Sequence, residues 1–293
     1  MRYRRYLEAV RGLADNTVNA YISDLWAFSA DTGINKVGDI TRQAVTDWMA
    51  DNDHELSDRT QSRRLTSLKT FVAWAVDEQI IDYSPIATMK RKVTSRKIPK
   101  YWTKSQMRRL LDHGAVGSDP ITLRDRAVLE LLYSFGPRVS ELCALDLDTI
   151  DPEDQVAVLE GKGDRERTVP VGVPALHAVQ AYLEHGRPHL DRTADLPPER
   201  RQWALLLTGT GRRMYRQEVA RIVSYCTGRV GVPDLGPHGF RDTAATHLLK
   251  SGADIRYIQE LLGHASVRTT QIYTHVAPED LIAEYRRTHP RAS

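Results

Sequence analysis

Cysteine is scarce in this sequence of 293 residues, which contains only Cys143 and Cys226. Two cysteines so far apart cannot form a disulfide framework or a structural zinc site by themselves, so we expect buried free thiols. No apolar stretch approaches the roughly 20 residues that a membrane span needs. The first residues, MRYRRYLEAVRGLADNT, lack the apolar core of a signal peptide. We therefore expect a cytoplasmic protein.

Two common motifs for phosphate and metal binding are also missing. The segment GKGDRE lacks the earlier glycine and the Ser or Thr after the lysine that a nucleotide-binding P-loop requires. The ten histidines include no HExxH pair, which makes a metal site built from them the least favoured interpretation. The sequence also shows no internal repeat and no low-complexity tract.

The bulk composition indicates a folded protein with more than one domain. At 293 residues the chain exceeds the length at which a single hydrophobic core usually stops growing. The hydrophobic content of 41% is ordinary, and the net charge of +3 permits a polyanionic partner without requiring one. Basic residues without any acidic residue stand between positions 90 and 100: Lys90, Arg91, Lys92, Arg96, Lys97 and Lys100. Such a run, taken alone, is typical of a solvated linker.

The first part of the chain, residues 3–83, follows a helical pattern throughout and predicts a small helical bundle. Thr17 and Thr41 are expected to cap helices, and a longer helix begins near Ser57. We assign this N-terminal helical domain to residues 1–88.

A basic linker, residues 89–102, precedes a second domain, residues 103–293, whose first helix begins at Thr103. The second domain is predicted to be mostly helical. The β-like runs QVAVL and RTVPV flank the Gly- and Asp-rich turn and predict a β-hairpin with Lys162 at its tip. Later helices are expected at residues 174–184, 216–227, 241–251, 255–262 and 278–287. The predicted fold class is therefore mainly α, with one small β-hairpin.

Two basic residues stand in settings that favour an anion. Arg138 follows Pro137 directly before a helix, where the helix dipole favours negative charge, so an arginine there makes most sense if an anion binds. The alternative is a salt-bridged surface arginine. Lys162, between two glycines, could reach a phosphate or donate a proton, and its alternative is a solvated turn lysine.

A second pair of polar residues spans the start of a predicted helix in PHGFRDTAATHLLKSG. His238 and Arg241 are three residues apart, so both could address one oxyanion from the same helical face. His238 could equally be a capping or packed histidine. His247 lies in the apolar part of the same helix, and we interpret it as structural.

The last candidates stand in QELLGHASVRTTQIYTHV. Gly263 is expected to end a helix, which places His264 at the helix exit and Tyr273 in a second short helix. Taken alone, a tyrosine in an amphipathic stretch is usually a core residue.

In combination these residues resemble the active site of the tyrosine recombinase (phage integrase) family: Arg138, Lys162, His238, Arg241, His264 and Tyr273. The resemblance extends to RVSEL, ERTVP, ATHLL, LLGH and TTQIYTH. The segments NTVNAYISDL and SRRLTSLKTFVAW, the linker and the closing THPRA resemble Xer-type members of the family. One departure is Asp242-Thr243 after the motif arginine, where Xer proteins usually carry His-Ser or similar residues.

The resemblance implies a fold and a mechanism. The N-terminal domain would be a SAM-like core-binding domain, and the C-terminal domain a catalytic domain of the DNA breaking–rejoining type. Tyr273 would be the nucleophile that forms a 3′-phosphotyrosyl bond, and Lys162 the general acid. Arg138 and Arg241 would stabilise the transition state, with His238 and His264 adding hydrogen bonds. No metal, ATP or other cofactor is expected.

The implied partner is double-stranded DNA, bound at a specific recombination site by a homo- or hetero-tetramer that exchanges strands through a Holliday junction. The candidate DNA contacts are basic residues of the first domain and the linker: Arg59, Arg63, Lys69, Arg91, Lys97 and Lys100. Residues 278–287 resemble the C-terminal helix that family members dock onto a neighbouring protomer, with Leu281, Ile282 and Tyr285 as apolar anchors.

The sequence leaves several functions open within this chemistry. Chromosome dimer resolution is the favoured role, and a mobile-element integrase or resolvase is the alternative. A DNA-binding accessory protein without activity is disfavoured by the presence of all six motif residues. A type IB topoisomerase is disfavoured by chain length and by the Xer-like ends. Whether a paralogous recombinase takes part, and whether a septal DNA translocase controls the reaction, also stays open.

Overall fold

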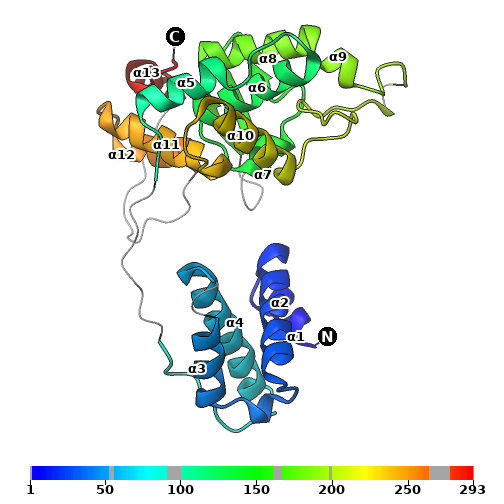
Figure 1. Cartoon of the computed structure of the whole chain (residues 1–293), viewed down its shortest axis with the longest axis vertical. Coiled ribbons are helices and arrows are strands. Elements are labelled where there is room, and N and C mark those ends of the chain that lie inside the picture. The colour runs from blue at the N-terminus through cyan, green and yellow to red at the C-terminus, as the bar shows by residue number, and fades with distance from the viewer. Residues whose placement is uncertain are drawn as a thin grey trace. The chain divides into compact units, whose positions relative to one another are not determined.

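The computed structural model describes residues 2–52, 56–90, 100–160, 166–197, 200–263 and 278–292; for Arg59 and residues 278–280 it describes the backbone alone. The chain forms two compact units, Met1–Lys97 and Ile98–Ser293, and each is considered by itself (Figure 1). In the described part of the chain, no helix combines the length and the apolar character needed to cross a membrane.

The first unit is a helical bundle in which α2 packs along α4 (Figure 1). Its elements are α1 (Arg2–Arg5), η1 (Tyr6–Val10), α2 (Asp15–Thr32), η2 (Val37–Asp39), α3 (Arg42–Asp51) and α4 (Asp58–Asp77). Two predicted starts are confirmed, because the hydroxyl groups of Thr41 and Ser57 accept hydrogen bonds from the first turns of α3 and α4. The predicted cap at Thr17 is wrong, since α2 already begins at Asp15.

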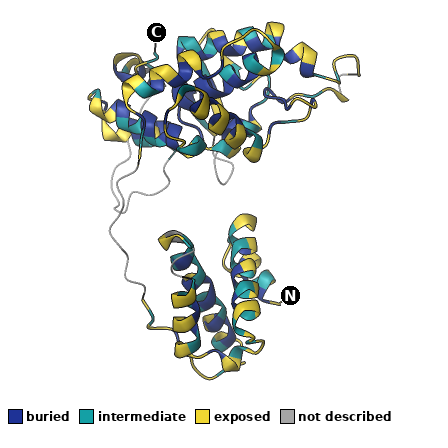
Figure 2. Cartoon of the chain, viewed as in Figure 1, coloured by how far each residue is buried: buried dark blue, intermediate teal, exposed yellow. Residues whose placement is uncertain are grey.

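Aromatic residues fill the core of this unit. Phe28 and Trp48 meet edge to face with their ring centroids 5.1 Å apart, and both are buried. Tyr3 and Trp74 belong to a second buried cluster that closes the other part of the bundle. The buried positions form continuous stripes on the inner faces of the helices (Figure 2). The unit therefore has a core of its own.

The second unit is built around α6, which is buried along nearly its whole length and packs against α8 and α11. Its elements are α5 (Lys104–His113), α6 (Pro120–Ser134), α7 (Val139–Ala144), β1 (Ile150–Asp151), β2 (Val156–Glu160), β3 (Glu166–Pro170), α8 (Val173–His185), α9 (Arg187–Leu190), α10 (Arg216–Val230), α11 (Gly236–Lys250), α12 (Ile255–Leu262) and α13 (Pro278–Thr288). The predicted helix start at Thr103 is confirmed, and Thr103 forms a capping box with Gln106 there.

The predicted β-hairpin is confirmed as part of a small antiparallel sheet. Strands β2 and β3 pair with Ala157 opposite Val169, and both side chains face the core. The sequence pattern missed the edge strand β1, because a two-residue strand shows no alternation. The predicted hairpin tip with Lys162 lies outside the described residues. The fold class, mainly α with a small sheet, is confirmed.

Helix α11 begins at Gly236, five residues before the predicted start at Arg241. Pro237 stands in the first turn, where its missing N–H costs no hydrogen bond and its fixed φ favours the helix. His238 and Arg241 therefore both lie inside the helix.

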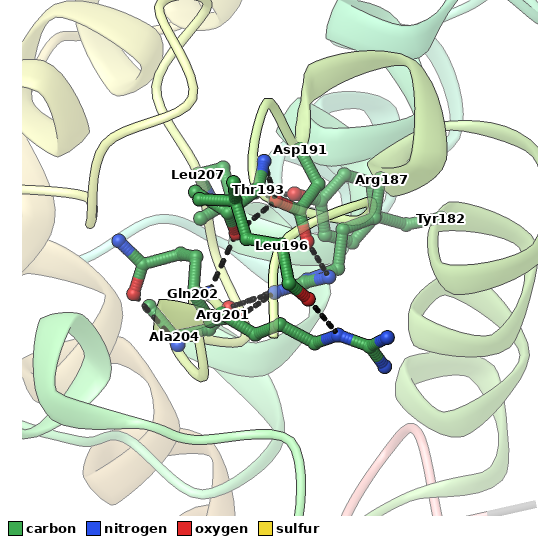
Figure 3. Close-up of polar contacts among 9 residues, drawn as sticks. All are labelled: Tyr182, Arg187, Asp191, Thr193, Leu196, Arg201, Gln202, Ala204 and Leu207. Carbon is green, nitrogen blue, oxygen red and sulfur yellow. Dashed lines mark hydrogen bonds and ion pairs between the residues drawn. The ribbon is translucent and has the colours of Figure 1, made fainter. Parts of the chain in front are cut away.

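A buried arginine holds the segment between α9 and α10 in place (Figure 3). The guanidinium group of Arg187 donates to the carbonyl oxygens of Gln202 at 2.5 Å and Ala204 at 3.0 Å, and pairs with Asp191 at 2.8 Å. Asp191 in turn accepts from the hydroxyl group of Thr193 at 2.6 Å. Arg187 is buried and bonded to Asp191 and to two backbone carbonyl oxygens, so we interpret it as a structural residue.

Both cysteines are free thiols, as predicted. Cys226 is buried, whereas Cys143 is only half-buried, so the prediction of burial is wrong for Cys143. Burial raises the pKa of the Cys143 thiol to about 11 and that of Cys226 to about 12. Neither thiol is therefore set up as a thiolate nucleophile at neutral pH.

The C-terminal segment packs against its own unit. Leu281 and Tyr285 are buried there, and the Tyr285 hydroxyl lies 2.9 Å from Ser134 Oγ. The ring of His289 stacks on Tyr285 with centroids 4.5 Å apart, and Arg291 pairs with Asp112 at 2.6 Å. Docking of this helix onto a neighbouring protomer stays a prediction, and the predicted anchor Ile282 is only half-buried in this arrangement.

Candidate active site

The turn between α6 and α7 carries Arg138 and lies directly against the end of α12. Gly136 in this turn has a φ of +56°, and a Cβ atom added to it would lie 2.9 Å from Leu262 Cδ2. The left-handed backbone at this position therefore favours glycine. Its carbonyl oxygen accepts a hydrogen bond from Arg241 Nη1 at 2.8 Å. The turn and helix α11 thus meet at the predicted site.

The C-terminal end of α12 is surrounded by arginines. Gly263 ends the helix in the left-handed conformation, with a φ of +61°, as the sequence predicted. The carbonyl oxygens of residues 261–263 accept in turn from Arg167 Nε at 3.4 Å, Arg241 Nη2 at 2.5 Å and Arg138 Nη2 at 2.7 Å. The negative end of the helix dipole favours these cations. The end of α12 therefore gathers three guanidinium groups at one place.

Glu141 connects two of these arginines. Its Oε1 atom lies 2.7 Å from Arg138 Nη1 and 3.0 Å from Arg167 Nη1, and its Oε2 atom lies 2.8 Å from Arg167 Nη2. Burial alone would raise the pKa of Glu141, but hydrogen bonds from Arg167 and Arg138 outweigh burial and lower the pKa below its usual value. The carboxylate stays charged at neutral pH, and the three arginines keep an excess of positive charge.

Arg241 is buried, with 4% of its surface exposed. Burial, followed by the charge of Arg138, lowers its pKa to about 10. The group is therefore still protonated at neutral pH. Arg138 is more accessible, with 43% of its side chain exposed. This arrangement can bind an oxyanion that approaches from the Arg138 side.

His238 lies on α11, three residues before Arg241, and its part in the site stays a prediction. His238 is 74% exposed, and its Nε2 atom lies 3.9 Å from Asp242 Oδ1. The Thr243 hydroxyl, next along, accepts from the backbone N–H of Trp102 at 3.1 Å and donates to Gly239 at 2.6 Å. Of the two residues that differ from the usual Xer pattern, Asp242 thus lies beside His238 and Thr243 lies in the core.

His247 is structural, as predicted. It is buried, and its Nδ1 atom lies 2.8 Å from the Tyr133 hydroxyl. Burial lowers its pKa, so the ring is neutral at pH 7. Three other predicted catalytic residues, Lys162, His264 and Tyr273, lie outside the described residues. Their roles stay predictions.

The predicted DNA contacts have different outcomes. Arg63 is held by the Asp24 carboxylate and by the carbonyl of Ala20. Lys69 is half-buried and donates to the carbonyl oxygen of Met89 at 3.1 Å, so its amino group serves its own unit. Lys100 is exposed. The side chain of Arg59, and Arg91 and Lys97 as a whole, lie outside the described residues.

Sequence reasoning missed two residues of the site, Glu141 and Arg167. A signal for Glu141 was present, because it stands three residues after Arg138, at capping-box spacing, in the quoted motif RVSEL. Arg167 stands in the quoted motif ERTVP, but nothing in its local sequence set it apart as a site residue. Its position on β3 became meaningful only when the sheet was placed beside α12.

Two family descriptions match this chain: "Phage integrase family" over residues 100–280, and "Phage integrase, N-terminal SAM-like domain" over residues 1–79. A tyrosine recombinase XerC of Mycobacterium sp. (strain KMS) is 42% identical over 99% of this chain and 98% of that protein. A tyrosine recombinase XerD of Bifidobacterium longum (strain NCC 2705) is 44% identical over 96% of this chain and 94% of that protein.

The fold also matches a solved recombinase. A crystal structure of the XerH site-specific recombinase in a post-cleavage complex with palindromic difH substrate superposes with a TM-score of 0.71 and 20% identity, covering 94% of this chain and 81% of that one. At this identity the match shows the fold alone, and it agrees with the two matched family descriptions. The chain therefore belongs to the phage integrase family, as a tyrosine recombinase of the Xer type.

Proposed function

We propose that this chain cleaves and rejoins DNA at a specific site through a covalent bond between Tyr273 and a 3′-phosphate. The observation that supports this most is the cluster of Arg138, Arg167 and Arg241 at the end of α12. That end is followed directly in the sequence by the segment 264–277, which contains His264 and Tyr273. A cluster of fixed cations is what a phosphodiester needs to reach its transition state.

In this proposal Arg138 and Arg241 stabilise the charge on the nonbridging oxygens of the scissile phosphate. Arg138 Nη2 donates to the carbonyl oxygen of Gly263, and this hydrogen bond orients the guanidinium group before DNA binds. A phosphate oxygen would then replace the Gly263 carbonyl oxygen as the acceptor. Arg241 uses both Nη atoms on carbonyl oxygens, which fixes its plane. The excess positive charge of the cluster favours the transition state, which carries more negative charge than the bound diester.

The proposed reaction is a transesterification. The Tyr273 oxygen attacks phosphorus, the bond to the 5′-oxygen breaks, and that oxygen takes a proton from Lys162. His264 and His238 would add hydrogen bonds, with His238 a weaker candidate to accept the tyrosine proton. The reverse reaction with the 5′-hydroxyl of a partner strand restores the phosphodiester. The bond energy is kept in the phosphotyrosyl ester, so the scheme needs no ATP.

The proposed biological role is chromosome dimer resolution, supported by the names of the XerC and XerD relatives. The partner would be double-stranded DNA, and the DNA-bound state of XerH supports this choice. The assembly would be a homo- or hetero-tetramer on two duplexes that passes through a Holliday junction, with a septal DNA translocase as a regulator. Such a substrate places the reaction in the cytoplasm.

The test is covalent trapping on a suicide duplex nicked near the cleavage point. We expect Tyr273→Phe to abolish the covalent adduct while leaving site binding largely intact. Tyr225→Phe is a matched control, because Tyr225 is 65% exposed on α10 and belongs to no part of the proposed site. A covalent adduct that persists in Tyr273→Phe, mapped by mass spectrometry to another residue, would contradict the assignment of the nucleophile.

A further inference from the structure

The first unit contains a groove whose lining residues belong to that unit alone. It has a volume of about 520 Å³ and is formed by α2 and α4. All but one of its lining residues carry a hydroxyl group, and the exception is an arginine: Thr17, Tyr21, Thr60, Ser62, Arg63 and Thr66. A groove of this composition offers donors, acceptors and threonine methyl groups side by side.

Arg63 is fixed in this groove by a carboxylate beneath it. Asp24 on α2 is buried, with 3% of its surface exposed, and its Oδ2 atom pairs with Arg63 Nη1. The same Nη1 atom donates to the carbonyl oxygen of Ala20 at 3.2 Å. Among the described residues, no partner is found for Arg63 Nη2 or Nε, and 39% of the side chain is exposed. The Nη1 atom is therefore anchored, and the side chain contributes to the lining of the groove.

This arrangement suits a neutral acceptor better than an anion. The Asp24 carboxylate offsets the charge of Arg63, which weakens attraction to a phosphate but leaves the N–H donors in place. The anchored side chain has already lost rotamer freedom, so it loses less entropy when it binds. The major-groove edge of guanine offers N7 and O6, which match the arginine fork, and threonine methyl groups suit the thymine methyl group.

We propose that Arg63 reads a guanine in the major groove of the DNA site, and that Asp24 is the positioning residue that orients it. The inference rests on the proposed function, because it takes DNA as the partner. It goes beyond that function by naming a base, the residue that reads it and the residue that holds that reader. The neighbouring hydroxyl groups of α2 and α4 contact the flanking bases.

The test uses a random duplex DNA library, from which the wild-type chain selects its own site. Arg63→Lys keeps the charge and the pairing with Asp24 but loses the fork. We expect it to lose the preference for guanine at one position per half-site and to bind the wild-type site about tenfold more weakly, as loss of a bidentate arginine–guanine pair does. The salt dependence of binding should stay unchanged. Arg2→Ala, which removes an exposed arginine paired with Glu78, is the control and should keep the selected sequence.

Asp24→Asn tests the positioning role. Arg63 is still present in this variant, so relaxed preference at the same position supports orientation by Asp24, with thermal unfolding measured to show that the unit remains folded. A uniform loss across sequences, with a salt slope reduced by about one, would show a phosphate contact and overturn the inference. Unchanged selection in both variants would also overturn it. Failure of the wild-type chain to select or covalently trap any DNA would instead overturn the proposed function.

Discussion

Replacement of Glu141 by glutamine tests whether this carboxylate organises the arginine cluster. Glutamine keeps the shape and one oxygen acceptor but removes the charge that Arg167 and Arg138 share. The Glu141 and Arg167 side chains are 6% and 12% exposed, so the change leaves Arg167 without compensation in a largely buried place. Loss of one partner from a buried ion pair costs about 3–5 kcal/mol. We expect the lower end, about 3 kcal/mol, because Arg138 is 43% exposed and its pairing is screened by solvent.

Hydrogen–deuterium exchange on the full chain measures this effect in the second unit alone. Peptides from the buried helix α6 report the free energy of global unfolding of that unit. The pKa of Glu141 is lowered in the folded state, so its stabilisation is complete above the ordinary pKa near 4.5 and is lost as the pH falls through the folded value. The wild type and Glu141→Gln should therefore differ most at neutral pH and converge in acid.

A matched control is Glu284→Gln, which removes an exposed pair with Arg287 and should cost less than about 1 kcal/mol. In the double variant Glu141→Gln/Arg167→Met, the loss should be smaller than the sum of the two single losses, because neither side of the Glu141–Arg167 pair then leaves the other without its partner. A change below about 1 kcal/mol for Glu141→Gln, or an unchanged pH dependence, would refute the reasoning.

Three further predictions concern the turn, the C-terminal segment and the proposed acid. Gly136→Ala should lower the free energy of unfolding by about 1–2 kcal/mol and slow DNA cleavage, since the new methyl group meets Leu262. The control Gly252→Ala, also at positive φ but with open space around it, should cost only the backbone strain. Equal cleavage rates in the two variants would contradict this. Burial lowers the pKa of His289 to about 3, so as the pH falls the unfolded state takes up the proton first. The free energy of unfolding should therefore fall by up to about 1.4 kcal/mol for each pH unit below pH ~6.5. In urea titrations His289→Gln should remove this slope. Lys162→Ala should slow cleavage of ordinary DNA far more than cleavage of a substrate with sulfur at the 5′-bridging position; equal slowing in single-turnover assays would exclude the general-acid role.

The local sequence predicted most helices and strands because the relevant signals are local. Thr41 caps its helix as expected, and helices begin at Ser57 and Thr103 as expected, since a capping hydroxyl group needs only the next turn of backbone. The left-handed Gly263 ended α12 for the same reason. The predicted helix start was wrong where two neighbouring residues could each begin the helix. Thr17 could start a helix, but α2 begins two residues earlier at Asp15.

For the candidate site, too, some features follow from the sequence and others only from the tertiary structure. The sequence by itself determined the family, which is confirmed, and through the resemblance to that family it predicted the six motif residues. Only the tertiary structure decided that Arg138, Arg167 and Arg241 converge on the end of α12 and that Glu141 bridges two of them. It also showed that the His238 side chain is exposed whereas that of Arg241 is buried. The physical reason is that charge pairing and burial depend on distances between segments far apart in sequence, whereas caps and periodicity depend on neighbours along the chain.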